Sequence, residues 1–283
     1  MKAFFSSCLH SNHYYSPIPT HVCKLHKSFY GLKQAPRAWY NKLHQFLISV
    51  SFTTSKTNVS LFIYSYNNVV IYLLVYVDDI VLIENCSSFI DSFVQALGRA
   101  FSIRDLGPLH YFLGIQVNHN SDGIWLSQSQ YIESILTKVG MIHCKPLSSP
   151  MATNAKLHKG DTPDFDDPSL YRQVVGALQC LILTKRDISF VVNKVCQFMH
   201  NPSFNQWAAV KRILRYLQHT KSMSFLFSKA SNLYLQAFTD SDWASSIDDR
   251  KSIGGYAIYF GPNLISWSSR KQRTVARSST ESE

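Results

Sequence analysis

Two adjacent aspartates lie inside the longest apolar stretch of the chain, and this feature constrains the fold most. In Val69–Ile83 (VVIYLLVYVDDIVLI), apolar residues run up to Asp78 and Asp79 and resume directly after them. Runs rich in β-branched and aromatic residues predict buried strands, and the aspartates fall where a two-residue hairpin would turn. We therefore expect a strand, a turn at Asp78-Asp79, and a second strand.

The aspartate pair permits two interpretations. Two neighbouring ionised carboxylates repel each other unless a divalent cation neutralises them, and metal-dependent phosphoryl transfer uses such an arrangement. The other interpretation is a polar hairpin tip in solvent, which turn statistics favour for an isolated Asp-Asp pair. The remaining motifs have to decide between the two.

Size and charge narrow the class of protein. The chain has 283 residues, enough for two units with separate cores. Its 28 Lys and Arg residues outnumber 18 acidic ones, and a net charge of +10 with 13% aromatic residues suits a polyanionic partner with stackable bases. The chain lacks both a bilayer-length apolar run and a signal-like apolar segment at its start, so we expect an intracellular protein, of unknown compartment, without a membrane partner.

Local patterns predict the elements of the N-terminal half. A helix is expected from Ala35, with Pro36 in its first turn, and the loop Gly31–Gln34 before it offers backbone donors to phosphates. Asn67-Asn68 predicts a tight hairpin turn, and Asp122-Gly123 predicts a second one. Two further helices are expected, at Ser87–Ala100 and Ser129–Val139.

Prolines between Met141 and Pro168 mark a linker, and three amphipathic helices are expected after it. On the third helix, Lys211, Arg212 and Arg215 lie outside the apolar stripe. A solvated basic face is favoured there over a face that tracks nucleic acid. After the third helix, apolar and polar residues alternate with a period of two. This predicts one antiparallel meander of four strands: Phe225–Phe227, Leu233–Phe238, Gly255–Phe260 and Leu264–Trp267.

Several segments resemble, in order, the Pol polyprotein of copia-type LTR retrotransposons over nearly everything after Val22. They are VCKLHKSFYGLKQAPRAWY, LLVYVDDIVLI, IRDLGPLHYFLGIQV with GIWLSQSQYI, YRQVVGALQCL, AVKRILRYLQHT, TDSDWASSIDDRKSIGGY and LISWSSRKQRTVARSSTESE. The resemblance implies an α+β fold: a partial reverse transcriptase palm with thumb and connection helices, followed by a truncated ribonuclease H-like domain. The expected parts are an unstructured lead-in (1–21), fingers and palm with the start of the thumb (22–140), a linker (141–168), helical thumb and connection (169–221) and the ribonuclease H-like domain (222–283).

The resemblance also implies site residues. Tyr76–Asp79 is similar to the YxDD box, whose aspartates Asp78 and Asp79 would help hold two Mg²⁺ (or Mn²⁺) ions, so the resemblance favours the metal interpretation. Asp240 and Glu283 match the first two carboxylates of a ribonuclease H metal site. Nucleotide and template binding is implied for Tyr30, Gly31, Leu32, Lys33, Gln34, Pro36, Arg37 and Tyr76, and a primer grip for Phe112, Leu113, Gly114 and Ile115.

Two departures from the family pattern bear on activity. The third metal-binding aspartate of the polymerase should lie on a strand upstream of VCKLHKSFYGLKQ, but Met1–Thr20 contains no aspartate. The ribonuclease H site needs further aspartates beyond the helix that Glu283 would begin.

The sequence therefore predicts a fragment of an RNA-directed DNA polymerase with a partial ribonuclease H domain, inactive as this chain. Its partners would be an RNA template, a DNA primer or RNA–DNA hybrid, and deoxynucleotides. The alternative is a non-catalytic remnant that only binds nucleic acid.

Overall fold

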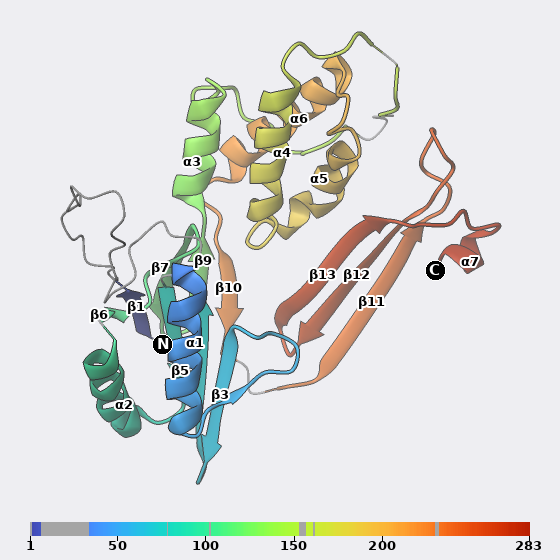
Figure 1. Cartoon of the computed structure of the whole chain (residues 1–283). Helices are drawn as coiled ribbons and strands as arrows, with labels where there is room; N and C mark the ends of the chain where they lie inside the picture. The colour runs from blue at the N-terminus through green and yellow to red at the C-terminus, as the bar shows by residue number, and fades with distance from the viewer. Residues whose placement is uncertain are drawn as a thin grey trace, which may run out of the picture. The chain divides into compact units, whose positions relative to one another are not determined.

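The computed structural model of the chain describes residues 2–6, 34–77, 79–101, 103–152, 157–160, 162–229 and 232–283. They divide into two units, Met1–Leu109 and His110–Glu283. Each unit combines helices with antiparallel strands, so the predicted α+β class is confirmed (Figure 1). None of the helices in the described ranges is both long and apolar enough to cross a membrane.

A six-stranded sheet organises the first unit. Its strands pair antiparallel in the order β2-β3-β4-β5-β1-β6. Asn67 and Asn68, both with positive φ, connect β3 to β4 as predicted. The strands are β1 (Lys2–Ser6), β2 (Thr53–Thr54), β3 (Leu61–Tyr66), β4 (Val69–Tyr76), β5 (Asp79–Glu84) and β6 (Ile103–Pro108).

Two helices, α1 (Ala35–Ser49) and α2 (Ser87–Ala100), supply the rest of the core of this unit. Side chains alternate along a strand, so only every second residue of β4 reaches that core. Its members include Leu43 and Leu47 of α1, Leu97 of α2, and Phe62, Ile71, Leu73 and Leu82 of the sheet, all without exposed surface. The intervening residues of β4 and β5 lie on the other face of the sheet.

Strand β1 lies in the stretch that was expected to be an unstructured lead-in. It is inserted between β5 and β6, with Phe4 opposite Ile80 on one side and Asp105 on the other. The apolar run Ala-Phe-Phe is too short to give a periodic signal in the sequence. Pairing with two neighbouring strands, rather than local propensity, therefore accounts for β1.

The second unit begins with a four-stranded antiparallel sheet in the order β10-β9-β8-β7. Its strands are β7 (Tyr111–Phe112), β8 (Ile115–Asn120), β9 (Gly123–Ser127) and β10 (Phe225–Ser228). The prediction of one four-stranded meander after residue 222 was wrong, because β10 pairs with β9 and puts Phe225 opposite Leu126. The sequence could not reveal this pairing, because the two strands are far apart along the chain.

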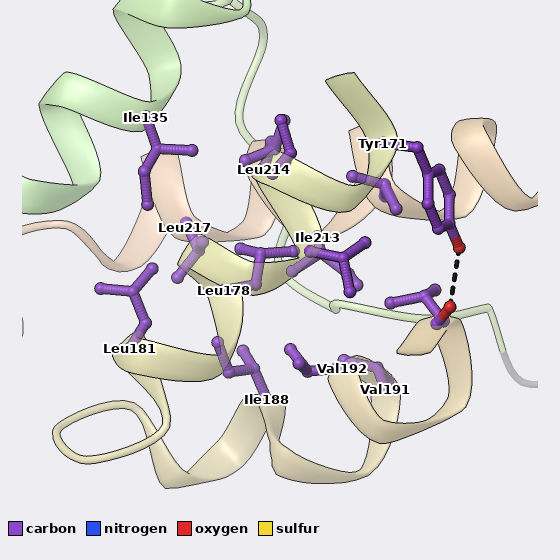
Figure 2. Packing of buried hydrophobic residues seen from close by; sticks show 14 of the residues in the cluster. Ile135, Tyr171, Leu178, Leu181, Ile188, Val191, Val192, Ile213, Leu214 and Leu217 are labelled. Atoms are coloured by element: carbon purple, nitrogen blue, oxygen red, sulfur yellow. Dashed lines mark hydrogen bonds between the residues drawn. The ribbon is translucent and has the colours of Figure 1, made fainter. Parts of the chain in front are cut away.

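Four helices and a short 3₁₀ turn share the largest core of the second unit. They are α3 (Ser129–Lys138), α4 (Pro168–Leu181), η1 (Arg186–Ile188), α5 (Ser189–Cys196) and α6 (Phe204–Thr220). Figure 2 shows leucines, isoleucines and valines of these helices converging, with Tyr171 at one side. The buried Tyr171 hydroxyl donates to the Val195 carbonyl oxygen at 2.8 Å, which satisfies its polar end. The three helices predicted after the linker are present.

The segment 141–152, part of the predicted linker, is bound along α6. Arg215 Nε donates to the Lys145 carbonyl at 2.7 Å, and Arg212 Nη2 donates to Ser149 Oγ at 2.8 Å. Gln218 adds a hydrogen bond to the Ile142 carbonyl. The predicted solvated basic face is therefore wrong for Arg212 and Arg215, because both side chains hold this segment in place.

A three-stranded antiparallel sheet completes the second unit, in the order β11-β12-β13. The strands are β11 (Leu235–Asp242), β12 (Ile253–Phe260) and β13 (Asn263–Lys271), and the short helix α7 (Ser279–Ser282) follows. Strand β13 lies beside α5, where Asn193 Nδ2 donates to the Ser269 carbonyl. The Arg186 guanidinium lies 3.4 Å from the Phe225 ring centroid and 5.5 Å from that of Trp267, so it contacts both β10 and β13.

Candidate active site

The hairpin of β4 and β5 carries the candidate polymerase residues. Strand β4 ends at Tyr76 and β5 begins at Asp79, and these two residues pair across the end of the hairpin. The connection therefore comes one residue earlier than predicted, and Asp79 belongs to a strand. Val77 has a φ of 51°, which is unusual for a β-branched residue and typical of strained functional turns. Asp78 lies outside the described residues.

Asp79 lies on the sheet face that α1 and α2 do not cover. Paired residues of an antiparallel ladder project from the same face, so Tyr76 and Asp79 share it with Tyr72 and its partner Ile83. The residues Tyr72 and Tyr76 are 42% and 51% exposed, whereas Asp79 is half-buried. This face thus combines a carboxylate with two exposed aromatic rings. Tyr72 was missed by the sequence reasoning, although period-two spacing from Tyr76 points to it.

The strand on the other side of Asp79 is β1. In the register, Phe5 stands opposite Asp79. The five residues of β1 are Lys, Ala, Phe, Phe and Ser, so this neighbouring strand brings no second carboxylate. Among the described residues, no three His, Cys, Asp or Glu side chains come together as a metal site requires. The described residues therefore do not fit the Mg²⁺ pair that the family resemblance implies.

The predicted nucleotide- and template-binding residues lie at the start of α1. Gln34 directly precedes the helix, and Pro36 and Arg37 occupy its first turn with exposed side chains. Four others, Tyr30, Gly31, Leu32 and Lys33, fall outside the described residues. Backbone donors and a cation at a helix start suit a phosphate group, but the described part of this segment includes only Arg37 as a charged residue.

The predicted primer-grip residues form a tight hairpin in the second unit. Leu113 and Gly114 have φ values of 50° and 79° and connect β7 to β8, while Phe112 pairs with Ile115. Two positive φ values in succession match the turn that suits two-residue β-hairpins. The residue pattern alone did not predict this turn, because Leu-Gly is not among the residue pairs that usually mark two-residue hairpins.

The two predicted ribonuclease H carboxylates differ in their surroundings. Asp240 is exposed on β11, opposite Gly255, and accepts a hydrogen bond from the Ser241 amide at 2.8 Å. Glu283 follows α7, whose Ser282 carbonyl accepts from Gln272 Nε2. Asp240 pairs with Gly255, so a Cβ on the preceding residue, Gly254, would project from the face opposite to Asp240. The Gln272 amide lies 3.5 Å from that Cβ position and therefore on this opposite face. The described contacts therefore do not gather Asp240 and α7 on one face.

The loop between β11 and β12 is joined to β13 by an ion pair. Asp249 accepts from Lys271 Nζ at 2.7 Å and from Ser246 Oγ at 2.5 Å. Burial alone would raise the pKa of Asp249, but the hydrogen bonds from Lys271 and Ser246 together with the positive charge of Lys271 lower it to about 2. The Asp249 carboxylate thus holds the loop against β13 through its ion pair with Lys271.

Comparison with known proteins places the chain among retroelement proteins. A family model described as reverse transcriptase (RNA-dependent DNA polymerase) matches residues 15–153. The retrovirus-related Pol polyprotein from transposon RE2 of Arabidopsis thaliana is 44% identical over 265 residues, 94% of this chain but 18% of the relative. The corresponding polyprotein from transposon TNT 1-94 of Nicotiana tabacum is 38% identical over 93% of this chain and 20% of its own length.

The chain also matches a shorter protein over most of that protein's length. An uncharacterized mitochondrial protein of Arabidopsis thaliana is 46% identical over 213 residues, which cover 75% of this chain and 88% of that protein. The chain therefore spans about a fifth of the polyproteins that it resembles and nearly all of this shorter protein. No solved structure gives a significant match to the chain.

Proposed function

This chain belongs to the reverse transcriptase family of copia-type transposon Pol polyproteins, and we propose that it binds primer–template nucleic acid without extending the primer. The observation that carries the proposal is the register at Asp79. A polymerase site needs carboxylates from two neighbouring strands, and the strand beside Asp79 presents Phe5 at the paired position. On this basis the hairpin keeps a nucleic-acid surface but lacks part of its catalytic charge.

The missing charge matters because of the reaction. In RNA-directed DNA synthesis the primer 3′-hydroxyl attacks the α-phosphorus of a deoxynucleotide and pyrophosphate leaves. Divalent ions, when bound, lower the pKa of the attacking hydroxyl and neutralise the departing phosphates. Carboxylates on one hairpin approach such ions from one side only, whereas mutual repulsion of the ions requires negative charge on several sides. Asp78 and Asp79 alone are therefore too few.

Primer extension by the purified chain tests the proposal. A primed RNA template with Mg²⁺ or Mn²⁺ and deoxynucleotides should yield no extended product, at enzyme concentrations where hybrid binding is saturated. The matched control is an Asp78→Asn, Asp79→Asn double variant, which should give the same background as the parent chain. Extension that the double variant abolishes would contradict the proposed inactivity.

The ribonuclease H-like part of the proposal covers β11, β12, β13 and α7. It rests on Asp240 at the end of a strand and on Glu283 after α7, in the order that the family resemblance implies. We propose that this part also lacks hydrolytic activity, because the Gln272 amide that contacts α7 lies on the face opposite to Asp240. Incubation with a labelled RNA–DNA hybrid should leave the RNA strand intact, and cleavage that an Asp240→Asn variant abolishes would contradict this.

The binding half of the proposal rests on the charge of the chain and on exposed aromatic side chains. The net charge of +10 supplies the attraction, and the exposed rings of Tyr72 and Tyr76 supply a stacking surface beside Asp79. Binding to single strands and to hybrid duplexes should be weak and independent of sequence, because phosphate contacts carry no sequence information.

A further inference from the structure

The backbone passes between the four-stranded sheet and the helices at two places, from β9 into α3 and from α6 into β10. Leu126, near the end of β9, pairs with Phe225, the first residue of β10, so both connections lie at the same end of the sheet. The candidate primer-grip hairpin is at this end too, because Gln116 of β8 pairs with both Tyr111 of β7 and Ser127 of β9. Contacts that hold the two connections therefore also set where this hairpin lies.

Two consecutive residues between α4 and η1 bind these connections. Thr184 Oγ1 donates to Gln128 Oε1 at 2.6 Å, and Gln128 is the residue that joins β9 to α3. Lys185 Nζ donates to two backbone carbonyl oxygens, that of Thr220 at the end of α6 and, at 2.8 Å, that of Met223 shortly before β10. Thr184 therefore holds one connection and Lys185 holds the other.

The hydrogen bonds at both connections are shielded from water. Gln128, Thr184 and Lys185 are 3%, 8% and 4% exposed. A buried ammonium group is costly unless acceptors surround it, and the carbonyls at the C-terminal end of a helix stabilise a cation there. The next residue, Arg186, adds a contact to β10, because its guanidinium lies 3.4 Å from the centroid of the Phe225 ring. Loss of a donor at this place would leave buried acceptors unsatisfied, so the contacts favour one arrangement of both connections.

We propose that Thr184, Lys185 and Arg186 form a clamp that fixes the four-stranded sheet on the helices, and that Lys185 is thereby a positioning residue for nucleic acid at the β7–β8 hairpin. The second part rests on the proposed function, the binding of primer–template nucleic acid. The hairpin presents Tyr111 and Leu113, which are 55% and 48% exposed, to such a partner. Lys185 is buried, so it acts on the hairpin through the connection between α6 and β10 and not by touching the strand.

Fluorine NMR of the full chain labelled with fluorotryptophan tests the clamp without nucleic acid. Trp125 lies on β9 and Trp207 lies in the core of the helices, so their signals report on the sheet and on the helices separately. Lys185→Met should shift or broaden the Trp125 signal and leave that of Trp207 unchanged, because two carbonyls at the α6–β10 connection lose this donor.

A milder variant covers the case in which Lys185→Met does not fold. Thr184→Val removes only the hydroxyl that binds Gln128 and should change the Trp125 signal in the same direction, whereas Thr184→Ser keeps a hydroxyl and should retain the parent spectrum. An unchanged Trp125 signal in Thr184→Val, or equal changes at Trp125 and Trp207, would overturn the clamp.

Binding of an RNA–DNA hybrid at several salt concentrations tests the positioning role. Lys185→Met should weaken binding by about fivefold or more and keep the salt dependence of the parent chain, because no phosphate contact is lost. Lys138→Met is the matched control for charge, because it removes an exposed cation from the last turn of α3, and it should weaken binding less.

The outcomes separate the positioning role from the proposed function. A salt slope reduced by about one in Lys185→Met would assign this lysine to a direct phosphate contact, and an unchanged affinity would leave it no part in binding, so either result overturns the positioning role. If the parent chain binds no hybrid, the proposed function fails together with the positioning role, whereas the fluorine spectra still decide whether the clamp exists.

Discussion

Tyr76 pairs with Asp79 across the last rung of the β4–β5 hairpin, so an exposed aromatic ring and a half-buried carboxylate lie on one face of the sheet. Bases stack on exposed rings at about 1–3 kcal/mol per base. Tyr76→Ala should therefore weaken binding of an RNA–DNA hybrid by about five-fold or more, measured by fluorescence anisotropy. Tyr66→Ala is the matched control, because Tyr66 is 65% exposed on β3 and lies outside the face of Asp79. Equal losses in the two variants would remove this face from the binding surface.

Salt should weaken the binding of nucleic acid strongly. The net charge of +10 predicts that phosphate contacts dominate, and each contact releases counterions from the strand. Raising salt from about 50 to about 200 mM should cost at least about tenfold in affinity, for single-stranded and hybrid ligands of several sequences alike. An affinity that does not change with salt would refute the electrostatic interpretation.

Gly123 allows β9 and β10 to approach each other. A Cβ at this position would lie 2.0 Å from the Phe227 carbonyl oxygen, and the φ of +149° further disfavours a side chain. Gly123→Ala should lower the free energy of unfolding of the second unit by about 2–3 kcal/mol, measured by urea titration with tryptophan fluorescence. Gly176→Ala in α4 is the control, because nothing lies within 4 Å of its Cβ position and alanine favours helix, so it should stabilise slightly.

The Asp249–Lys271 ion pair should give a small stabilisation that acid removes. Since the pKa of Asp249 is lowered to about 2 in the folded chain, the stabilisation is complete above the ordinary carboxyl range near 4 and is lost as pH falls through about 2. The pair is partly exposed, so a double-mutant cycle of Asp249→Asn and Lys271→Met should give less than about 1 kcal/mol at neutral pH. A coupling energy that stays constant down to pH 2 would contradict this assignment.

Local patterns in the sequence predicted most elements but not their pairing. The apolar runs around Asp79 identified β4 and β5, and Asn67-Asn68 identified the turn before β4. The turn at residue 77 was missed by one position, because a positive φ is unexpected for valine. Strand β1 was missed because its apolar run is short, and only contacts with β5 and β6 make it a strand.

Contacts between segments that are far apart in the sequence explain the other differences between prediction and structure. Strand β10 has the same alternating pattern as the strands that follow it, so periodicity could not tell which sheet it joins. Arg212 and Arg215 look solvent-facing on a helical wheel, but their partners come from a proline-rich segment that carries no signal of where it lies. At the candidate site, the family resemblance supplied Asp79 and Tyr76, whereas the position of Phe5 needed the register of the sheet.

The pairing of β9 with β10 also sets a delay during synthesis of the chain. Residues 128–224 separate the two strands, and a ribosome adds about 5–20 residues per second, so β9 waits roughly 5–20 s for its neighbour. Throughout that time the β8–β9 hairpin has an unpaired edge. Because α3, α4, α5 and α6 lie between the two strands in the chain, they are all synthesised before β9 can pair, and until then the edge of β9 stays open to pairing with other strands.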